Sequence, residues 1–278
     1  MAKSTVYFTK EISSDSLLRI YRTLGVQLKE KAAVKLSTGE PGGHNFLQPG
    51  MIKELVKEVN GTIVECNTAY GGPRSKTKSH WEVMKKHGFL EIAPCDIMDG
   101  EKEIALEIIG GKHLKQNFVG ANLQNYGSVL ILSHFKGHVM GGFGGALKNM
   151  SIGIASAHGK SQIHNAGGFL GISKQNAFLE AMAEACKSVV DYMGSENIVY
   201  INVANRLSVD CDCDSNPAEP KMADIGILAS ADPVAVDQAC VDAVYRSPDE
   251  GKKDLIKRIE SRNGIHTIEA AETLGLGS

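Results

Sequence analysis

Short apolar segments alternate with amphipathic segments along most of the chain. The apolar runs typical of buried strands are Ala32–Leu36, Thr62–Cys66, Ser128–Leu132, Ile198–Val203 and Ile225–Leu228. The clearest helix is Ser173–Met193, in which apolar side chains recur at helical spacing. This alternation predicts an α/β fold with a mixed or mainly parallel sheet and flanking helices. Because no linker divides the chain, we expect a single α/β domain over residues 1–278, at most with two tightly packed lobes.

Weaker patterns predict the remaining elements. Shorter strands are expected at Val6–Thr9, Ile92–Cys95, Ile104–Ile109 and His113–Val119. Further helices are expected at Asp15–Lys29, Met51–Val59, Ser79–His87, Lys252–Ser261 and Thr267–Leu274, and one begins near Pro233.

The overall charge argues against several classes of partner. The chain has 278 residues, a net charge of −2 and a pI of about 6.5, so we expect no nucleic-acid partner. No apolar run approaches the length of a membrane span, and the N-terminus MAKSTVYFTKE lacks the apolar core of a signal peptide. We therefore expect a cytoplasmic protein that does not bind membranes.

Polar, often glycine-rich segments follow several of the predicted strands. They read STGEPGGH, NTAYGGPR, SHFKGHVMGGFGG, NRLSVDCDCD and SADPVAVD. In open α/β sheets, ligands bind beyond the carboxyl ends of the strands. The sequence therefore predicts one ligand site to which these segments contribute.

The stretch HFKGHVMGGFGGALKNM, residues 134–150, is the richest of these segments in chemistry. We interpret it as a glycine-rich loop, since its pattern favours neither helix nor strand. Gly144 and Gly145 allow a ligand to approach the backbone, while Lys136 and Lys148 suit phosphate or carboxylate groups. No Walker lysine and hydroxyl follow the glycines, which argues against an ATPase. The alternative is an ordinary turn with solvated side chains.

Several histidines and one arginine are further candidates for the site. His134, His138 and His164 lie within 31 positions of one another and suit metal binding or proton transfer. Arg74 in YGGPRS and His44 in EPGGHNF lie on loops after strands and are candidates for holding an anion or cofactor.

The segment VDCDCDSN contains the one pair of clustered cysteines. In an extended chain Cys211 and Cys213 face the same side and suit zinc, iron or an iron–sulfur cluster. The alternating aspartates are expected to raise the pKa of both thiols. No ferredoxin-type run of cysteines is present. The alternative is an exposed acidic loop.

Taken in order, these segments resemble a known family. GEPGGHNFLQP, CNTAYGGPRS, LSHFKGHVMGGFGGALKNMSIG, CDCDSN and DIGILASADPVAVDQA are similar to the domain of unknown function 362 family, whose members are often described as iron–sulfur-centre proteins. The resemblance runs from about Val6 to Gly277. Many relatives carry a ferredoxin-like insertion after the region matching SQIH, and this chain lacks it. The iron–sulfur property is therefore not carried over directly.

A shorter pattern resembles the nickel-pincer-dependent lactate racemases. It comprises His138, the glycine-rich turn, Lys148 and His164, with spacings of 10 and 16 residues. The resemblance implies that His138 is an acid/base, that Lys148 holds the cofactor and that His164 ligates nickel.

These observations lead to one expectation and two alternatives. We expect a protein that binds a metal or metallo-cofactor, with nickel, iron and zinc all open, and an isomerase- or racemase-like enzyme acting on a small anionic organic substrate. One alternative is an iron–sulfur or redox carrier centred on Cys211 and Cys213, which would have a redox partner protein. The other is a non-catalytic binding module for a phosphorylated small molecule. A homo-oligomer is compatible with all three.

Overall fold

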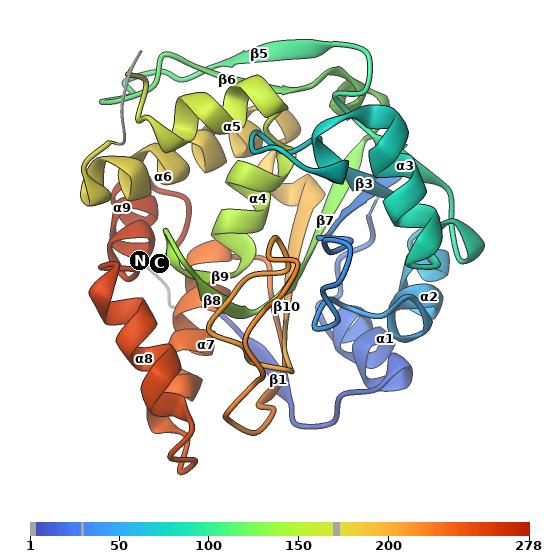
Figure 1. The fold of residues 1–278 in the computed structure, drawn as a ribbon, viewed down its shortest axis with the longest axis vertical. Coiled ribbons are helices and arrows are strands. Elements are labelled where there is room, and N and C mark those ends of the chain that lie inside the picture. Colours follow the sequence, from blue (N-terminus) through green and yellow to red (C-terminus); the bar gives the residue numbers. More distant parts are fainter. Residues whose placement is uncertain (1–3, 29–30, 169–172) are drawn as a thin grey trace.

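A mixed, mostly parallel sheet forms the centre of the molecule (Figure 1). The computed structural model describes residues 4–28, 31–168 and 173–278. Within these ranges, a seven-stranded sheet has the order β1-β11-β10-β7-β2-β3-β4. Its strands are β1 (Tyr7–Thr9), β2 (Ala32–Lys35), β3 (Gly61–Glu65), β4 (Cys95–Ile97), β7 (Ser128–His134), β10 (Ile198–Ala204) and β11 (Gly226–Ser230). Strands β10, β7, β2, β3 and β4 are parallel, whereas β11 is antiparallel to both of its neighbours. The α/β fold predicted from the sequence is confirmed.

The apolar runs become central strands because helices cover both faces of the sheet. On β7, Val129 and Ile131 pack into one hydrophobic cluster, whereas Leu130 and Leu132 pack into another on the opposite face. A strand that is buried on both faces needs apolar side chains at successive positions, as the run SVLIL provides.

The helices are divided between the two faces (Figure 1). One face is covered by α1 (Ser14–Thr23), α2 (Pro49–Glu58) and α3 (Thr77–Lys86). The other is covered by α4 (Ala146–Ile154), α6 (Gln175–Met193), α7 (Pro233–Arg246), α8 (Lys252–Ser261) and α9 (His266–Thr273). Helix α5 (Ala157–His164) packs against α6 in a smaller cluster. None of the helices within the described ranges has the length and apolar character needed to cross a bilayer.

Two small sheets and four short 3-10 turns complete the described structure. Strands β5 (Glu103–Glu107) and β6 (Gln116–Gly120) form an antiparallel ribbon, and β8 (Lys136–His138) pairs with β9 (Gly142–Gly144). The 3-10 turns are η1 (Pro73–Ser75), η2 (Phe89–Glu91), η3 (Ala121–Asn125) and η4 (Ser195–Asn197).

Two segments differ from the sequence-based expectation. The stretch 134–150 is not a loop, because it contains the end of β7, the hairpin β8–β9 and the start of α4. Residues 157–164, for which no element was expected, form α5. Both segments are rich in glycine or small polar residues, so neither shows the amphipathic period on which the prediction relied. Two sets of bounds were also wrong. The first helix, expected to run to Lys29, ends at Thr23, and residues 25–28 are not helical; Lys29 itself lies outside the described residues. The strand expected at Ile92–Cys95 is β4, which only begins at Cys95.

Candidate functional site

A cavity of about 310 Å³ opens beyond the carboxyl ends of β2, β3 and β7. Its walls also include the β8–β9 hairpin, α4, α5 and the segment 210–214. Of the residues singled out in the sequence, it is lined by Arg74, His134, Lys136, His138, Gly144, Gly145, Lys148, His164, Cys211 and Cys213. The structure thus brings together residues from four separate polar stretches of the chain.

The first turn of α4, which carries Lys148, is fixed by a carboxylate from α7. Asp237 accepts hydrogen bonds from the backbone N–H groups of Ala146 (2.7 Å) and Leu147 (2.9 Å). A Cβ on Gly145 would lie 2.3 Å from the Asp237 carboxylate, so this approach requires glycine. Burial raises the pKa of Asp237 to about 6. The glycine-rich segment therefore lets α4 begin directly on a buried carboxylate.

A compact group of soft ligand atoms lies at one end of the cavity. The ligand atoms of His138, Cys211 and Cys213 all lie within 4.8 Å of one another. Lys148 Nζ donates a hydrogen bond to Cys211 Sγ at 3.5 Å. Thiolate sulfur and imidazole nitrogen suit zinc, nickel or iron. Within the described residues, this group is a candidate metal site.

The two thiols of this group have opposite pKa shifts. The hydrogen bond from Cys213, together with Lys148 and Lys136, holds the pKa of Cys211 well below its usual value. The same hydrogen bond to Cys211, together with burial, raises the pKa of Cys213. The expectation that the neighbouring aspartates raise both values is therefore wrong for Cys211. The lysines that oppose them come from β8 and α4, which the local sequence does not reveal.

The hydrogen bonds of His138 fix which of its nitrogens carries the proton. Its Nδ1 accepts hydrogen bonds from the backbone N–H groups of Gly141 (2.8 Å) and Met140 (3.3 Å). Burial, reinforced by Lys148, lowers the pKa of His138 to about 4, which leaves the ring neutral at pH 7. A neutral ring whose Nδ1 accepts must hold its proton on Nε2. His138 therefore donates a hydrogen bond from Nε2 to the thiolate of Cys211 in this arrangement.

His134 is occupied by structural contacts, although it also lines the cavity. Its Nδ1 lies 2.8 Å from Asp212 Oδ1, and its Nε2 lies 2.7 Å from the carbonyl oxygen of Asn205. Lys136 forms an ion pair with the other carboxylate oxygen of Asp212 at 2.9 Å. With both ring nitrogens directed at oxygen acceptors, His134 offers no lone pair to a metal ion. This network holds the cysteine loop against the end of β7.

His164 has the arrangement of a histidine that is free to ligate. Its Nδ1 donates to the carbonyl oxygen of Lys160 at 2.6 Å, and its ring stacks on Phe178. Burial lowers its pKa, so the ring is neutral at pH 7. Nδ1 therefore carries the proton, and Nε2 keeps its lone pair. His164 lines the same cavity but lies outside the compact group.

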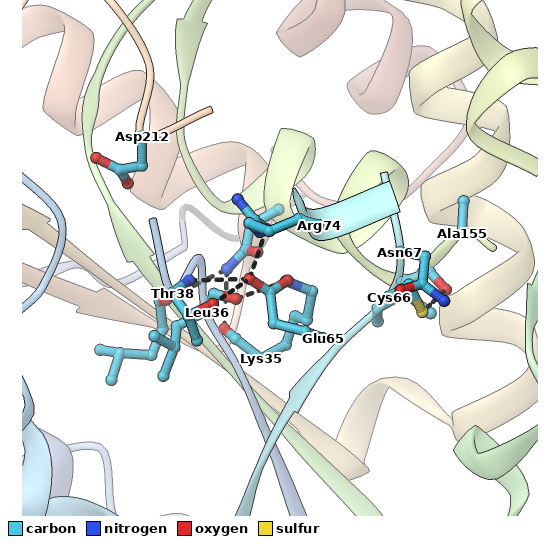
Figure 2. Close-up of polar contacts among 12 residues, drawn as sticks. Lys35, Leu36, Thr38, Glu65, Cys66, Asn67, Arg74, Ala155 and Asp212 are labelled. Carbon is cyan, nitrogen blue, oxygen red and sulfur yellow. Dashed lines mark hydrogen bonds and ion pairs between the residues drawn. The ribbon is translucent and has the colours of Figure 1, made fainter. Parts of the chain in front are cut away.

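Another part of the cavity lining is a buried ionic network (Figure 2). Glu65 lies between Lys35 (2.9 Å) and Arg74 (2.8 Å), and it also accepts from the backbone N–H of Thr38 (2.8 Å). Burial alone would raise the pKa of Glu65, but Lys35 and Arg74 hold it well below its usual value. Arg74 also pairs with Glu40 at 3.6 Å. Its charge is therefore already balanced by carboxylates.

One residue that was expected in the site lies outside it, and one that was not expected lies within it. His44 does not line the cavity: it is exposed, pairs with Glu219 at 3.1 Å and so does not contribute to this site. Its glycine-rich loop instead contacts the backbone of residues 214 and 215, as the close approach at Gly42 and Gly43 shows. Lys160, which no pattern in the sequence had indicated, lines the cavity and is 7% exposed. Its position four residues before His164 would have indicated a shared helix face.

The family model described as Domain of unknown function (DUF362) matches residues 32–242, a segment that includes every residue lining the cavity. The chain belongs to this family. No curated protein matches the sequence of this DUF362 protein.

Two solved structures are similar to this DUF362 protein. One is the lactate racemase apoprotein from Thermoanaerobacterium thermosaccharolyticum, with 14% identity, a TM-score of 0.49, and coverage of 84% of this chain and 56% of that one. The other is a protein from Thermotoga maritima, with 12% identity, a TM-score of 0.48, and coverage of 85% of this chain and 59% of that one. The chain thus spans less than two thirds of the length of either protein.

Proposed function

We propose that this DUF362 protein is an enzyme that holds a soft metal ion, or a cofactor carrying one, and acts on a small anionic organic compound. The observation that carries this proposal is the pair of thiols of Cys211 and Cys213, which lie beside His138 and Lys148 in one cavity. Ligand atoms of this softness select metals such as zinc, nickel and iron. The cation next to them supplies a natural contact for an acidic substrate.

The donors in the cavity fit a metal in different ways. Cys211 is predisposed to the thiolate form, and metal binding would release the proton of Cys213. His138 would have to lose its Nε2 proton to ligate, whereas His164 offers Nε2 without such a loss. We therefore assign Cys211, Cys213 and His164 to metal or cofactor binding. A metal bound there would act as a Lewis acid toward a substrate oxygen.

The remaining side chains supply charge and a proton. Lys148 neutralises an acidic group of the substrate or cofactor. Lys136, although paired with Asp212, adds to the positive potential in the cavity. His138 holds a proton on Nε2 and can donate a hydrogen bond to negative charge that develops on the substrate. Arg74 contributes through the ionic network of Glu65 rather than as a free cation. Proton transfer without a net redox change is the chemistry of an isomerase or racemase, and this is the reaction class we propose.

Metal analysis of the protein purified without oxygen tests this function. We expect a soft divalent metal at close to one equivalent, lost in Cys211→Ser and in Cys213→Ser. Cys95→Ser is the matched control, because the thiol of Cys95 lies outside the cavity and contacts the carbonyl oxygen of Ala93. Absence of any bound metal after growth with zinc, nickel and iron would contradict the proposal.

The visible spectrum of the same preparation separates the redox-carrier alternative. The paired thiols of Cys211 and Cys213 favour that alternative, but only Cys66 of the other four cysteines lines the cavity. The Cys66 thiol donates to the carbonyl oxygen of Ile154, and burial raises its pKa to about 12. A broad visible band that bleaches on reduction would identify a cluster and replace the enzyme proposal. Binding of phosphorylated compounds without metal would instead favour the non-catalytic module.

A further inference from the structure

Lys160 is a buried lysine on the cavity wall that the function proposed above does not use, and burial lowers its pKa. It lies on α5 and is 7% exposed, and its Nζ donates to the carbonyl oxygen of Ala155 at 2.6 Å. An ammonium group has three donors, so this contact leaves two unused. Burying an ammonium group without a paired charge is costly, which raises the question of what pairs with it.

No carboxylate of the described residues pairs with Lys160. Lys35 pairs with Glu65 and Lys136 with Asp212, but no carboxylate oxygen comes within 4.0 Å of Lys160 Nζ in the described ranges. Asp99 acts on it only from a longer range. Both oxygens of Asp99 already accept backbone N–H groups, from Asn67 (2.8 Å) and Ala157 (3.0 Å). Lys160 therefore has the donors and the surroundings of a side chain that binds an anion.

Lys148 is the second lysine of the cavity that lacks a carboxylate partner among the described residues. The two lysines come from different helices, α4 and α5. His164 lies within electrostatic range of both, since each contributes to lowering its pKa. Because Lys160 and His164 are four residues apart on α5, they share one face of that helix. The cavity therefore presents two lysines without carboxylate partners among the described residues, and both lie within electrostatic range of His164.

We propose that Lys160 binds a second acidic group of the ligand, so that the cavity takes a compound with acidic groups at both ends. One group lies against Lys148 near the cysteines, and the other against Lys160. The inference rests on the proposed function, because it assumes that the cavity binds a small anionic compound. The cavity volume of about 310 Å³ is at the lower end of the range for small-molecule sites. A short dicarboxylate, or a carboxylate that carries a phosphate, meets these requirements.

A purely structural role is the competing explanation for Lys160. Ala155 ends α4, and a lysine that holds a carbonyl oxygen at a helix C-terminus is stabilising in its own right. That role uses one donor and predicts no effect on ligand choice. The two explanations therefore differ in whether Lys160 distinguishes diacids from monoacids.

Calorimetric titration of the full chain with matched acids tests the inference. Succinate and butyrate have chains of equal length but differ in the second carboxylate, and phosphonopropionate replaces one carboxylate of succinate by a phosphonate. We expect one of the two diacids to bind at least about tenfold more tightly than butyrate, as a charge-assisted contact implies. The preferred diacid then indicates whether the second group is a carboxylate or a phosphate.

Substitution of Lys148 and Lys160 shows which of them causes the preference for diacids over butyrate. Lys160→Met is expected to bring diacid affinity down to that of butyrate and to leave butyrate affinity unchanged, whereas Lys148→Met weakens all three acids. Lys160→Arg is expected to retain part of the preference. Lys115→Met is the control, because Lys115 also contacts a backbone carbonyl but does not line the cavity.

The outcomes separate the inference from the proposed function. A diacid preference that survives in Lys160→Met overturns the inference. Equal binding of butyrate and both diacids by the unmodified protein also overturns the inference, and this result does not depend on whether Lys160→Met folds. In that case the anion site of the proposed function stands. If no acid binds the unmodified protein, the anion site and the inference both fail.

Discussion

Lys148 and Cys211 are 63 residues apart in the chain, yet the ammonium nitrogen lies 3.5 Å from the thiol sulfur. This contact joins the helix α4 to the cysteine loop and places a positive charge beside a sulfur atom. A nearby cation favours the thiolate form, so the reactivity of one residue reports on the position of the other.

Replacing Lys148 by methionine is expected to make Cys211 less reactive at neutral pH. The pKa of Cys211 is held low in part by Lys148, so removing the charge raises it and shifts the thiolate to higher pH. The rate of alkylation by iodoacetamide, followed from pH 5 to 10 in chelator-treated protein, measures this shift. Cys211→Ser assigns the labelled site. An unchanged pH profile in Lys148→Met would sink the claim that this lysine stabilises the thiolate.

Lys148→Ala is further expected to weaken ligand binding strongly while the fold survives. Cys186→Ala is expected to leave binding intact and to lower stability slightly. A lost charge-assisted contact reduces affinity by about one to two decades. Cys186 is fully buried on α6, where its thiol contacts the carbonyl oxygen of Leu147. Its removal should lower the free energy of unfolding by about 1 kcal/mol without affecting affinity. Chemical unfolding and anion titration of both variants check this; unchanged affinity in Lys148→Ala would contradict the anion-holding role.

Gly145→Ala is expected to destabilise the protein and to disturb the position of Lys148. The added methyl group would lie 2.3 Å from the Asp237 carboxylate, and such overpacking typically costs about 1–3 kcal/mol. Gly50→Ala is the matched control on α2, because a Cβ there meets nothing within 4 Å. We expect Gly50→Ala to be neutral or slightly stabilising. Equal unfolding midpoints for the two variants would contradict the proposed contact.

The stability of the protein below pH 4.5 is expected to depend on Glu180. Hydrogen bonds from His113, Lys112 and His266 lower the pKa of Glu180 to about 2. Because the folded-state value is below the unfolded value, the ionised carboxylate stabilises the fold above pH 4.5. That contribution is lost as the pH falls toward 2.

Melting temperatures measured from pH 3 to 7 test this dependence. Glu180→Gln should lower the melting temperature at pH 7 and flatten its decline between pH 4.5 and 3. Glu272→Gln, which changes an exposed carboxylate on α9, is the control and should follow the unmodified protein. If the melting temperatures of both variants fall with pH in parallel with that of the unmodified protein, a group other than Glu180 governs the loss of stability in acid.

The sequence predicted the strands of the sheet well because their apolar character is local. The run SVLIL indicates a strand buried on both faces, and β7 confirms it. The sequence also indicated which loops lie close together, since the carboxyl ends of parallel strands lie along one edge of the sheet. The helix α4 could not be predicted in this way, because its start depends on Asp237, which lies 91 residues beyond Ala146.

The charges within the site were harder to predict than its location. The aspartates next to Cys211 are visible in the sequence, whereas Lys136 and Lys148 reach it only after folding. Lys160 was missed because α5 has few apolar residues and no clear amphipathic pattern. Arg74 was expected to hold an anion or cofactor, but two carboxylates already balance it, and they come from β3 and from the loop after β2.

The carboxylate of Asp237 also sets an order of events during synthesis. Ribosomes make the chain from its N-terminus, so the hairpin β8–β9, α4 and the cysteine loop all emerge before the residue that anchors the start of α4. Until α7 emerges, the backbone N–H groups of Ala146 and Leu147 lack their acceptor. The lysine that faces the thiolate therefore takes its final position only after residue 237 has been made. The residues that line the cavity are thus synthesised before the cavity can form.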